Sequence, residues 1–309
     1  MTHTAPPARD GISPSKLYLP KITPTPVSIF AYLCDKFAHI SVDEWQVRFG
    51  DGLVVDGDGK RLTIDTPYQQ GMTIYYYKSL AYEVPVPFEH HIIYENDALL
   101  VVDKPHFLTV TPSGRYVVQT LLTRLKRQFD NADISPIHRL DRETAGLILF
   151  AKTPSARSAY QALFATRAMT KTYHAIAPYR SSLQFPLSLA LNLERGEPFY
   201  TMQVGQGVPN TQTDIDIIAV SDDKNFAKYE LKPSTGKLHQ LRVHMNHLGI
   251  AIVHDSFYPV VAHAADDDFS CPLQLLAKRL EFIDPLTGEM MAFESRFELD
   301  LAHIATELG

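Results

Sequence analysis

The chain has 309 residues, of which 45% are hydrophobic, so it can bury a substantial core and does not have the composition of a disordered protein. Its two cysteines, Cys34 and Cys271, form no CxxC pair, which excludes a disulfide framework and argues against structural zinc. The net charge of −6 argues against a nucleic acid as the partner, because proteins that bind phosphates usually carry an excess of basic residues.

The N-terminal residues and the length of the apolar runs indicate the cellular compartment of the protein. Residues 1–8 lack the basic-then-apolar order of a signal peptide. No apolar run approaches the roughly 18 residues of a membrane span. We therefore expect a soluble, cytoplasmic protein that contacts no membrane, and we expect it to be a monomer.

The first 85 residues predict an arm followed by a small α+β domain. Residues 1–26 are rich in proline with little periodicity, which indicates an extended arm. Apolar residues at four-residue spacing predict a helix over 27–37. A turn-forming Asp-Gly sequence within 53–64 predicts a β-hairpin, and 72–77 predicts a further strand. The small domain is therefore expected over 27–85.

Residues 86–309 predict a larger domain in which helices and hairpins are mixed. Helices are expected at 117–129, 154–164 and 241–248. Strands are expected at 92–103 around a turn, 147–151, 173–177, 215–217, 227–231 and in a hairpin over 280–293. Because there is no regular βαβ alternation, we predict an α+β fold rather than a Rossmann or TIM fold.

Basic residues concentrate in one part of the chain. From Lys104 to Arg180 there are 12 Lys and Arg against 4 Asp and Glu. This permits an RNA partner, although solvated helix faces explain such residues equally well. The candidates for phosphate contacts are Arg115, Arg124, Lys126, Arg127, Arg157 and Arg167.

The polar segment His138–Thr144 precedes an apolar strand and is predicted to be a loop, the kind of position where catalytic groups are found. Within it Asp141 lies between Arg139 and Arg142. Cations so near keep a carboxylate ionised, as a nucleophile or general base must be. The charge pattern alone is also that of a surface ion-pair cluster, which is the commoner case.

This segment, with the strand and Ala151-Lys152 after it, resembles the signature motif of the RluA family of pseudouridine synthases, His-Arg-Leu-Asp-x-x-Thr-Ser-Gly. Ala145 replaces the serine of that motif. Further segments that are similar to family motifs follow in the expected order: Val101–Pro105, Lys171–Tyr173, Thr235–Met245, Asp255–Tyr258 and Asp284–Glu289. On these motifs the chain is identified as a member of the family.

Membership implies a pseudouridine-synthase fold over residues 86–309, with a mixed, mostly antiparallel central sheet flanked by helices. It implies an enzyme that isomerises a uridine in structured RNA and needs no cofactor and no metal. The resemblance makes Asp141 the catalytic carboxylate and Arg242 its counter-ion, and it makes Tyr173 a stacking residue that helps to remove the carbon-5 proton. Further substrate-binding residues implied are Lys104, His138, Arg139, Arg142, Thr144, Lys237, His239 and Gln240.

The resemblance also implies the kinds of RNA. The family acts on 23S ribosomal RNA and on the tRNA anticodon stem-loop, and the stretch Asp255–Tyr258 favours the readers of short stem-loops. The small domain over 27–85 has the element order of an RNA-binding domain that some relatives carry. Its acidic residues make phosphate binding by it doubtful, so a degenerate or purely structural domain is expected.

Other interpretations stay open. The histidines at 239, 244, 247 and 254 suggest a metal site, but no matching cysteine or carboxylate spacing accompanies them. Asp141 and Glu143 suggest a glycoside hydrolase, although two carboxylates on one loop cannot easily flank a scissile bond. A protein that binds or folds RNA without catalysis is the non-enzymatic alternative. Departures from the family pattern at Thr111, Lys237, Ile250, Ala251 and Leu276 concern the rim of the expected pocket.

Overall fold

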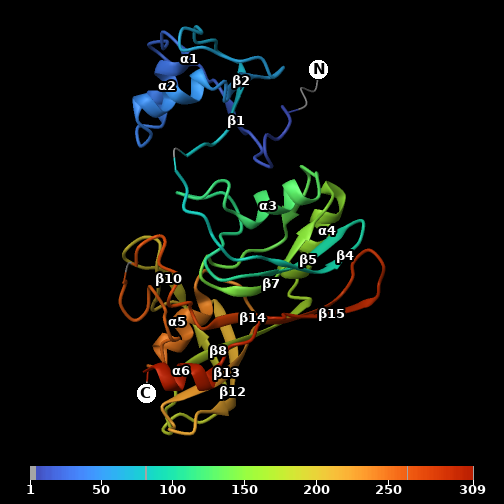
Figure 1. Ribbon diagram of the computed structural model, residues 1–309, viewed down its shortest axis with the longest axis vertical. Helices are drawn as coiled ribbons and strands as arrows, with labels where there is room; N and C mark the ends of the chain where they lie inside the picture. The colour runs from blue at the N-terminus through green and yellow to red at the C-terminus, as the bar shows by residue number, and fades with distance from the viewer. Residues whose placement is uncertain (1–4, 81, 263, 309) are drawn as a thin grey trace. The chain divides into compact units, whose positions relative to one another are not determined.

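The computed structural model describes residues 5–80, 82–262 and 264–308, which form two compact units (Figure 1). One unit contains the described residues up to Glu83 together with Thr111–Ala132. The other contains Val84–Val110 and the described residues from Asp133 onward. The predicted boundary at residue 86 assigns 111–132 to the larger domain, whereas in the structure Thr111–Ala132 groups with the N-terminal residues. Within the described ranges no helix is long and apolar enough to cross a membrane.

The smaller unit is an antiparallel three-stranded sheet with helices. Its strands are β1 (Ser15–Tyr18), β2 (Val54–Asp56) and β3 (Thr73–Tyr76), in the order β1-β3-β2, and its helices are α1 (Ile29–Lys36), α2 (Val42–Gly50) and α3 (Leu121–Gln128). The predicted arm over 1–26 therefore supplies one strand of this sheet, since its residues Ser15–Tyr18 form β1 and pair with β3. Leu17 packs against the core and Leu19 is fully buried, but one such alternation among prolines is too short to predict a strand.

The predicted hairpin over 53–64 forms only next to its turn. Val55 and Arg61 make an isolated antiparallel bridge, and the N–H groups of Asp56 and Leu62 donate to the carbonyls of Lys60 and Val54, both at 2.9 Å. The longer pairing of β2 is with β3. The Asp56 carboxylate accepts hydrogen bonds from the backbone N–H groups of Asp58 and Lys60, both at 2.9 Å. These bonds satisfy the turn locally, and the chain then leaves the sheet.

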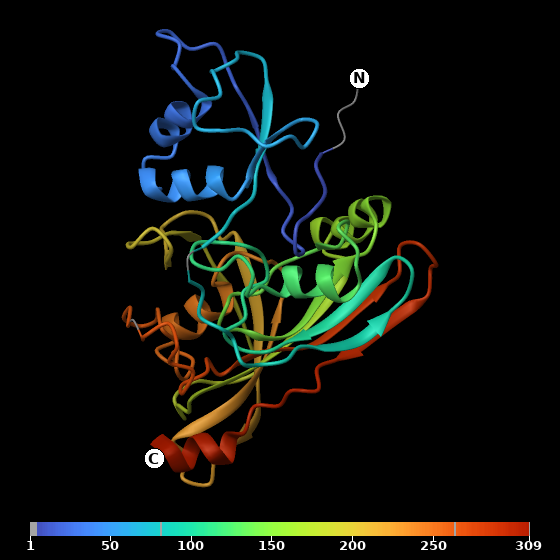
Figure 2. The same ribbon diagram turned by 45° about the horizontal axis from the view of Figure 1, so that its top comes forward.

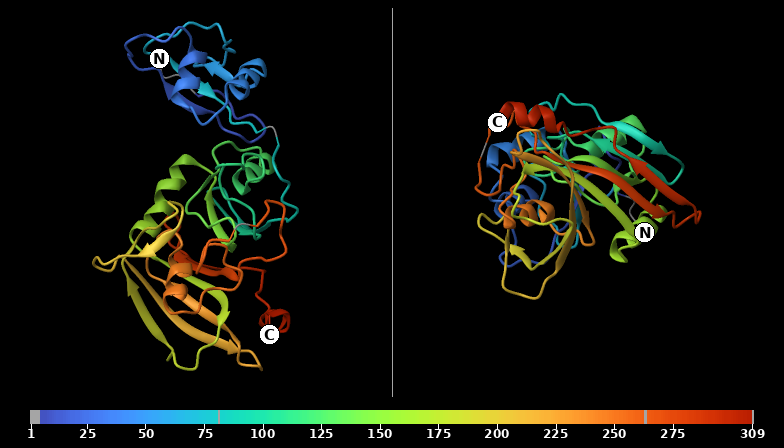
Figure 3. Two further views of the ribbon diagram at one scale, coloured as in Figure 1. Left: turned by 90° about the vertical axis from the view of Figure 1, so that its left-hand side faces the viewer. Right: turned by 90° about the horizontal axis from the view of Figure 1, so that it is seen from below.

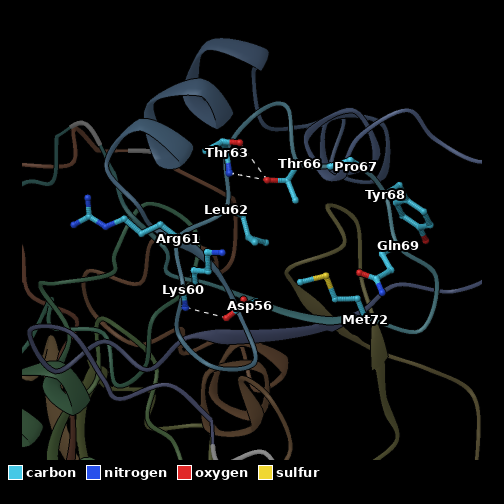
Figure 4. A pocket seen from close by; sticks show the side chains of 10 residues that line it. All are labelled: Asp56, Lys60, Arg61, Leu62, Thr63, Thr66, Pro67, Tyr68, Gln69 and Met72. Carbon is cyan, nitrogen blue, oxygen red and sulfur yellow. Dashed lines mark hydrogen bonds between the residues drawn. The ribbon is translucent and has the colours of Figure 1, made fainter.

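A cavity of about 650 Å³ lies within this smaller unit (Figure 4). Its wall comes from residues 56–72 and includes Lys60 and Met72. The N–H of Thr63 donates to the Thr66 hydroxyl at 2.9 Å, which holds one side of the opening. None of the predicted catalytic or substrate-binding residues lines it.

The larger unit is built on a ten-stranded sheet that confirms the predicted α+β class. Its strands are β4 (His91–Glu95), β5 (Leu99–Lys104), β6 (Ser135–Pro136), β7 (Ala145–Ala151), β8 (Met169–Pro178), β9 (Leu187–Leu191), β12 (Thr211–Val220), β13 (Phe226–Pro233), β14 (Leu275–Ile283) and β15 (Met290–Glu294). The order is β4-β5-β7-β14-β8-β13-β12-β9, with β6 on β7 and β15 on β14. The β7–β14 pair is parallel and the other described pairs are antiparallel.

Three helices and a small ribbon complete this unit. The helices are α4 (Pro154–Ala165), α5 (Gln240–His247) and α6 (Leu301–Leu308), and the ribbon pairs β10 (Leu193–Arg195) with β11 (Met202–Val204). Thr153 caps α4 by accepting a hydrogen bond from the N–H of Ala156, as its sequence predicts. Helix α6, which the sequence analysis did not predict, contacts β13 (Figure 2).

Gly146 allows β7 and β14 to approach closely at the centre of the sheet. Its φ is +110°, and a Cβ at this position would lie 2.3 Å from the carbonyl oxygen and 2.6 Å from the nitrogen of Ala277. Neither backbone atom can move without breaking the β7–β14 pairing. Position 146, the second residue after the predicted catalytic loop His138–Thr144, must therefore be glycine.

We expect Gly146→Ala to lower the free energy of unfolding by about 3 kcal/mol, because the strained φ and the overpacking add. Urea denaturation measures this. Gly288→Ala is the matched control: its φ is also positive, at +77°, but no atom lies within 4 Å of the added Cβ. At Gly288 the added Cβ overpacks nothing, so only the strain of the positive φ remains, which lowers the free energy of unfolding by about 1 kcal/mol. Equal losses in the two variants would contradict the packing argument.

Candidate active site

Arg242 of α5 lies at the centre of a cluster of three carboxylates and is only 1% exposed. Its Nε and Nη2 donate to the two Asp255 oxygens at 2.8 and 2.5 Å. Nη2 also donates to Glu143 Oε2 at 3.1 Å, and Nη1 lies 3.6 Å from Asp141 Oδ2. Burial would lower the pKa of Arg242, but Asp255, followed by Asp141 and Glu143, raises it above its ordinary value.

The three carboxylates differ in their access to solvent. The side chain of Asp255 is 0% exposed, that of Glu143 is 16% exposed and that of Asp141 is 28% exposed. Asp255 also accepts hydrogen bonds from the backbone N–H groups of Phe257 and Tyr258 at 2.9 and 3.0 Å. The protein thus supplies hydrogen bonds to both oxygens of Asp255, whereas Asp141 is the most exposed of the three carboxylates.

Lys104 holds the loop that carries Asp141. Its buried ammonium donates to the carbonyls of Pro105, Leu108 and Arg142 at 2.9, 2.8 and 3.1 Å. Three acceptors match the three N–H bonds of the ammonium group. Burial lowers the pKa of Lys104 to about 7. The loop is therefore fastened, one residue after Asp141, to the end of β5.

Two further side chains approach Asp141. His239 Nε2 lies 3.8 Å from Asp141 Oδ2, and its Nδ1 is 2.9 Å from the Tyr258 hydroxyl. Tyr173 is on β8, where it pairs with Ala277 of β14 and Leu231 of β13. Burial, and after it the charge of Asp141, raises the pKa of Tyr173, so the phenol is neutral at physiological pH.

The chain is similar to known proteins over about two thirds of its length. The family model described as RNA pseudouridylate synthase matches residues 98–247. The dual-specificity RNA pseudouridine synthase RluA of Salmonella typhi is 33% identical over 209 residues, covering 66% of this chain and 91% of the relative. The tRNA pseudouridine synthase C of Vibrio parahaemolyticus is 29% identical over 231 residues, covering 69% of this chain and 92% of the relative.

The chain belongs to the RluA family of pseudouridine synthases. It is accordingly an isomerase that converts uridine to pseudouridine in RNA. A solved structure, human RNA pseudouridylate synthase domain containing 1, shares the fold with a TM-score of 0.53 at 23% identity, covering 71% of this chain and 94% of that one. The predicted family and fold are thereby confirmed.

The structure brings four of the synthase's predicted site residues together around one point. These are Asp141, Tyr173, His239 and Arg242. Gln240 and Thr144 lie behind them: Gln240 bonds to Gln212, Thr213, Thr235 and Lys237, and Thr144 donates its N–H to the Asp141 carbonyl at 3.2 Å.

Some of the remaining predicted substrate-binding residues make contacts within the protein, and the others are exposed. The Lys104 ammonium donates its hydrogen bonds to backbone carbonyls at the loop that carries Asp141. His138 Nε2 accepts from the N–H of Leu149 at 3.1 Å, and its ring stacks on Phe164. Arg139 and Lys237 are exposed. The Arg142 guanidinium lies 5.4 Å above the Phe107 ring, and its Nη2 is 3.4 Å from the Asp266 carbonyl.

Sequence reasoning did not assign roles to Glu143, Asp255 and Tyr258 in the synthase. Asp255 and Tyr258 belong to a motif that the sequence analysis used only as a landmark. Their functions depend on which side chain they meet, since Asp255 binds Arg242 and the Tyr258 hydroxyl binds His239. The sequence did offer one signal for Asp255: it is an acidic residue in the family motif Asp255–Tyr258, which follows Arg242 along the chain.

Neither alternative chemistry finds support in the cluster. Among the described residues, no three His, Cys, Asp or Glu side chains are grouped to hold a metal ion. His244 is fully buried with Nε2 on the Thr211 hydroxyl at 2.9 Å. Asp141 and Glu143 both approach the guanidinium of Arg242. They share a cation and do not flank a space for a scissile bond.

Buried histidines predict that the synthase loses stability in acid. Burial, and secondarily the charge of His247, lowers the pKa of His244 to about 4. A depressed pKa means that stability is fully present above the unfolded value near 6.5 and is lost as the pH falls towards about 4. Between pH 7 and 5, His244 should therefore remove about 2 kcal/mol from the free energy of unfolding.

Urea denaturation at several pH values checks this expectation. Between pH 7 and 5 the free energy of unfolding of His244→Gln should fall less steeply than that of the wild type. The difference in slope should correspond to about one proton fewer taken up on unfolding. His303→Gln is the control, because that histidine is exposed on α6. An unchanged slope in the His244 variant would contradict the assignment of this proton to His244.

Proposed function

We propose that this synthase isomerises one uridine in a short RNA stem-loop, in the tRNA anticodon arm or in 23S ribosomal RNA, with Asp141 as the catalytic carboxylate. The observation that carries the proposal is the difference in access among the three carboxylates on Arg242. Asp255 and Glu143 neutralise the guanidinium from the protein side. Asp141 makes the longest contact, 3.6 Å, and is the most exposed of the three.

The reaction needs a negative group next to the glycosidic bond. The bond from ribose carbon 1′ to uracil N1 breaks, the uracil turns, and a bond from carbon 1′ to carbon 5 forms. N1 gains a proton and carbon 5 loses one, so no oxidant or further reactant is required. The buried guanidinium of Arg242 lies 3.6 Å from Asp141 Oδ2 and places a fixed positive charge beside this carboxylate.

Tyr173 is suited to stacking on the base rather than to acting as a phenolate. Its raised pKa keeps the hydroxyl protonated, and a neutral phenol is a weak base. The ring is near enough for the charge of Asp141 to raise its pKa, and an aromatic ring in such a place can pack against a turned uracil. We therefore propose stacking as its main contribution.

The names of the relatives and the charge of the chain support the class of RNA. One relative is named a dual-specificity RNA enzyme and another a tRNA enzyme. The basic residues between Lys104 and Arg180 supply candidates for phosphate contacts. A target uracil must leave its stack to be turned, and an unpaired loop lowers the free energy that this requires.

Pseudouridine mapping tests the proposal. Transfer RNA and ribosomal RNA from a deletion strain should lack one pseudouridine that the parent strain has, and the purified protein should restore it. Loss of a site in a stem-loop supports the proposal, and loss of a site inside a continuous duplex contradicts the loop assignment. If no site is lost and none is restored, the chain binds or folds RNA without catalysis.

A further inference from the structure

The β10–β11 hairpin projects from the larger unit beside α5 (Figures 1 and 3). The turn between its two strands, residues 196–201, contains Phe199. Phe199 is 80% exposed. Its backbone is nevertheless held: the N–H and the hydroxyl of Thr201 both donate to the Pro198 carbonyl at 2.8 Å, and Arg195 Nη1 donates to the Phe199 carbonyl at 3.2 Å. The ring is therefore presented to solvent by an ordered turn.

A line of aromatic rings connects this tip to the catalytic cluster. The ring centroids of Phe199 and Tyr200 are 5.5 Å apart, and those of Tyr200 and Phe257 are 5.4 Å apart. Phe257 lies 5.3 Å from the ring of His239, whose Nε2 is 3.8 Å from Asp141. The exposed ring is thus continuous with the site at which the target base is expected.

The hairpin is also fastened to that site. The N–H of Met202 donates to the Tyr258 hydroxyl at 2.8 Å, and the same hydroxyl is 2.9 Å from His239 Nδ1. Leu193 packs in a buried cluster with Val243 and Tyr258. The position of Phe199 relative to Asp141 is therefore set by packing and hydrogen bonds within one unit.

The charge of the hairpin selects the part of RNA that it can bind. Residues 193–204 contain Glu194 and Glu197 but a single cation, Arg195, so they do not attract phosphates. Exposed aromatic faces bind unpaired bases by stacking, without reading their sequence. When the target uracil leaves its stack, its neighbours in the loop lose a stacking partner and need another surface.

We propose that the β10–β11 hairpin is a nucleobase-stacking site, on which an unpaired base flanking the target uridine packs against Phe199. This inference rests on the proposed function, because it assumes an RNA loop as the substrate. It goes further in assigning a binding surface and in naming the flanking bases as its ligand. The site should favour RNA with an unpaired loop over continuous duplex.

The test compares full-length variants on two RNA probes. The probes are a hairpin with a uridine-rich loop and a fully paired duplex of equal length, and a 2-aminopurine placed in turn at each loop position reports stacking. Phe199→Ala should weaken binding to the loop hairpin roughly tenfold and leave duplex binding within about twofold. It should also remove the quenching of one loop 2-aminopurine that the wild type produces.

Two variants serve as controls. Phe199→Trp keeps a stacking face and should retain both affinity and quenching. Val208→Ala alters another strongly exposed apolar side chain, 85% exposed, on the loop after β11, and should bind the hairpin as the wild type does. Circular dichroism establishes that all variants fold.

The outcomes separate this inference from the proposed function. If Phe199→Ala binds the loop hairpin like the wild type, or loses hairpin and duplex binding equally, the stacking site is wrong whatever the enzyme turns over. If the wild type converts no uridine but Phe199→Ala shows the selective loss, the stacking site stands and the proposed activity fails. On an RNA that is turned over, the variant should raise KM about tenfold with kcat within about twofold.

Discussion

Asp141→Asn is expected to abolish tritium release from RNA labelled at carbon 5 of uridine, with kcat falling by more than about 10³-fold. Asparagine has the same shape, and its Oδ1 can still accept a hydrogen bond from Arg242. It carries no negative charge and is not a nucleophile. Binding of RNA should stay within a few fold, because the substitution removes no surface that contacts phosphate.

Glu143→Gln is the matched control for this experiment. Glu143 lies on the same loop and contacts the same guanidinium at 3.1 Å, but its side chain is only 16% exposed. We expect its kcat to stay within about tenfold of the wild type, since it supports Arg242 without reaching the substrate. If Glu143→Gln is inactive and Asp141→Asn is active, Glu143 is the catalytic carboxylate and Asp141 supports Arg242. If Asp141→Asn turns over RNA as fast as the wild type, Asp141 is not the catalytic carboxylate.

Arg242→Gln is expected to lower the free energy of unfolding by about 3–5 kcal/mol, because it leaves buried carboxylates without their cation. Asp255 is affected most, since its side chain is 0% exposed and two of its hydrogen bonds come from this guanidinium. Activity should also be lost, since the Asp141 loop loses its contact with α5. Urea denaturation and tritium release measure the two effects.

A surface arginine provides the comparison for Arg242. Arg279 donates to Glu281 at 2.7 Å, but its side chain is 49% exposed, so Arg279→Gln should cost no more than about 1 kcal/mol. A loss in Arg242→Gln no greater than that in Arg279→Gln would contradict the buried cluster.

Much of the fold followed from local patterns. The amphipathic spacing and the Thr153-Pro154 cap predicted α4, and the alternation in 215–217 and 227–231 predicted the β12–β13 pair. These signals are visible because one face of each element is buried and the other is solvated. The sequence analysis missed β1, which has only four residues, and α2, whose buried apolar side chains are only Trp45 and Phe49. Residues next in space rather than next in sequence cover these side chains.

The sequence by itself determined the family, the motif loop with Asp141 and the helix with Arg242, since motif residues are adjacent along the chain. Only the tertiary structure decided which of the acidic residues Arg242 pairs with most closely. It showed that Asp255, 13 residues away, takes the bidentate position and that Asp141 keeps a longer, more exposed contact. It also showed that Lys104 and His138 serve the loop and that Phe199 connects through rings to His239. The reason is physical: burial and hydrogen-bond geometry depend on which elements meet in space, and residue type and spacing do not record it.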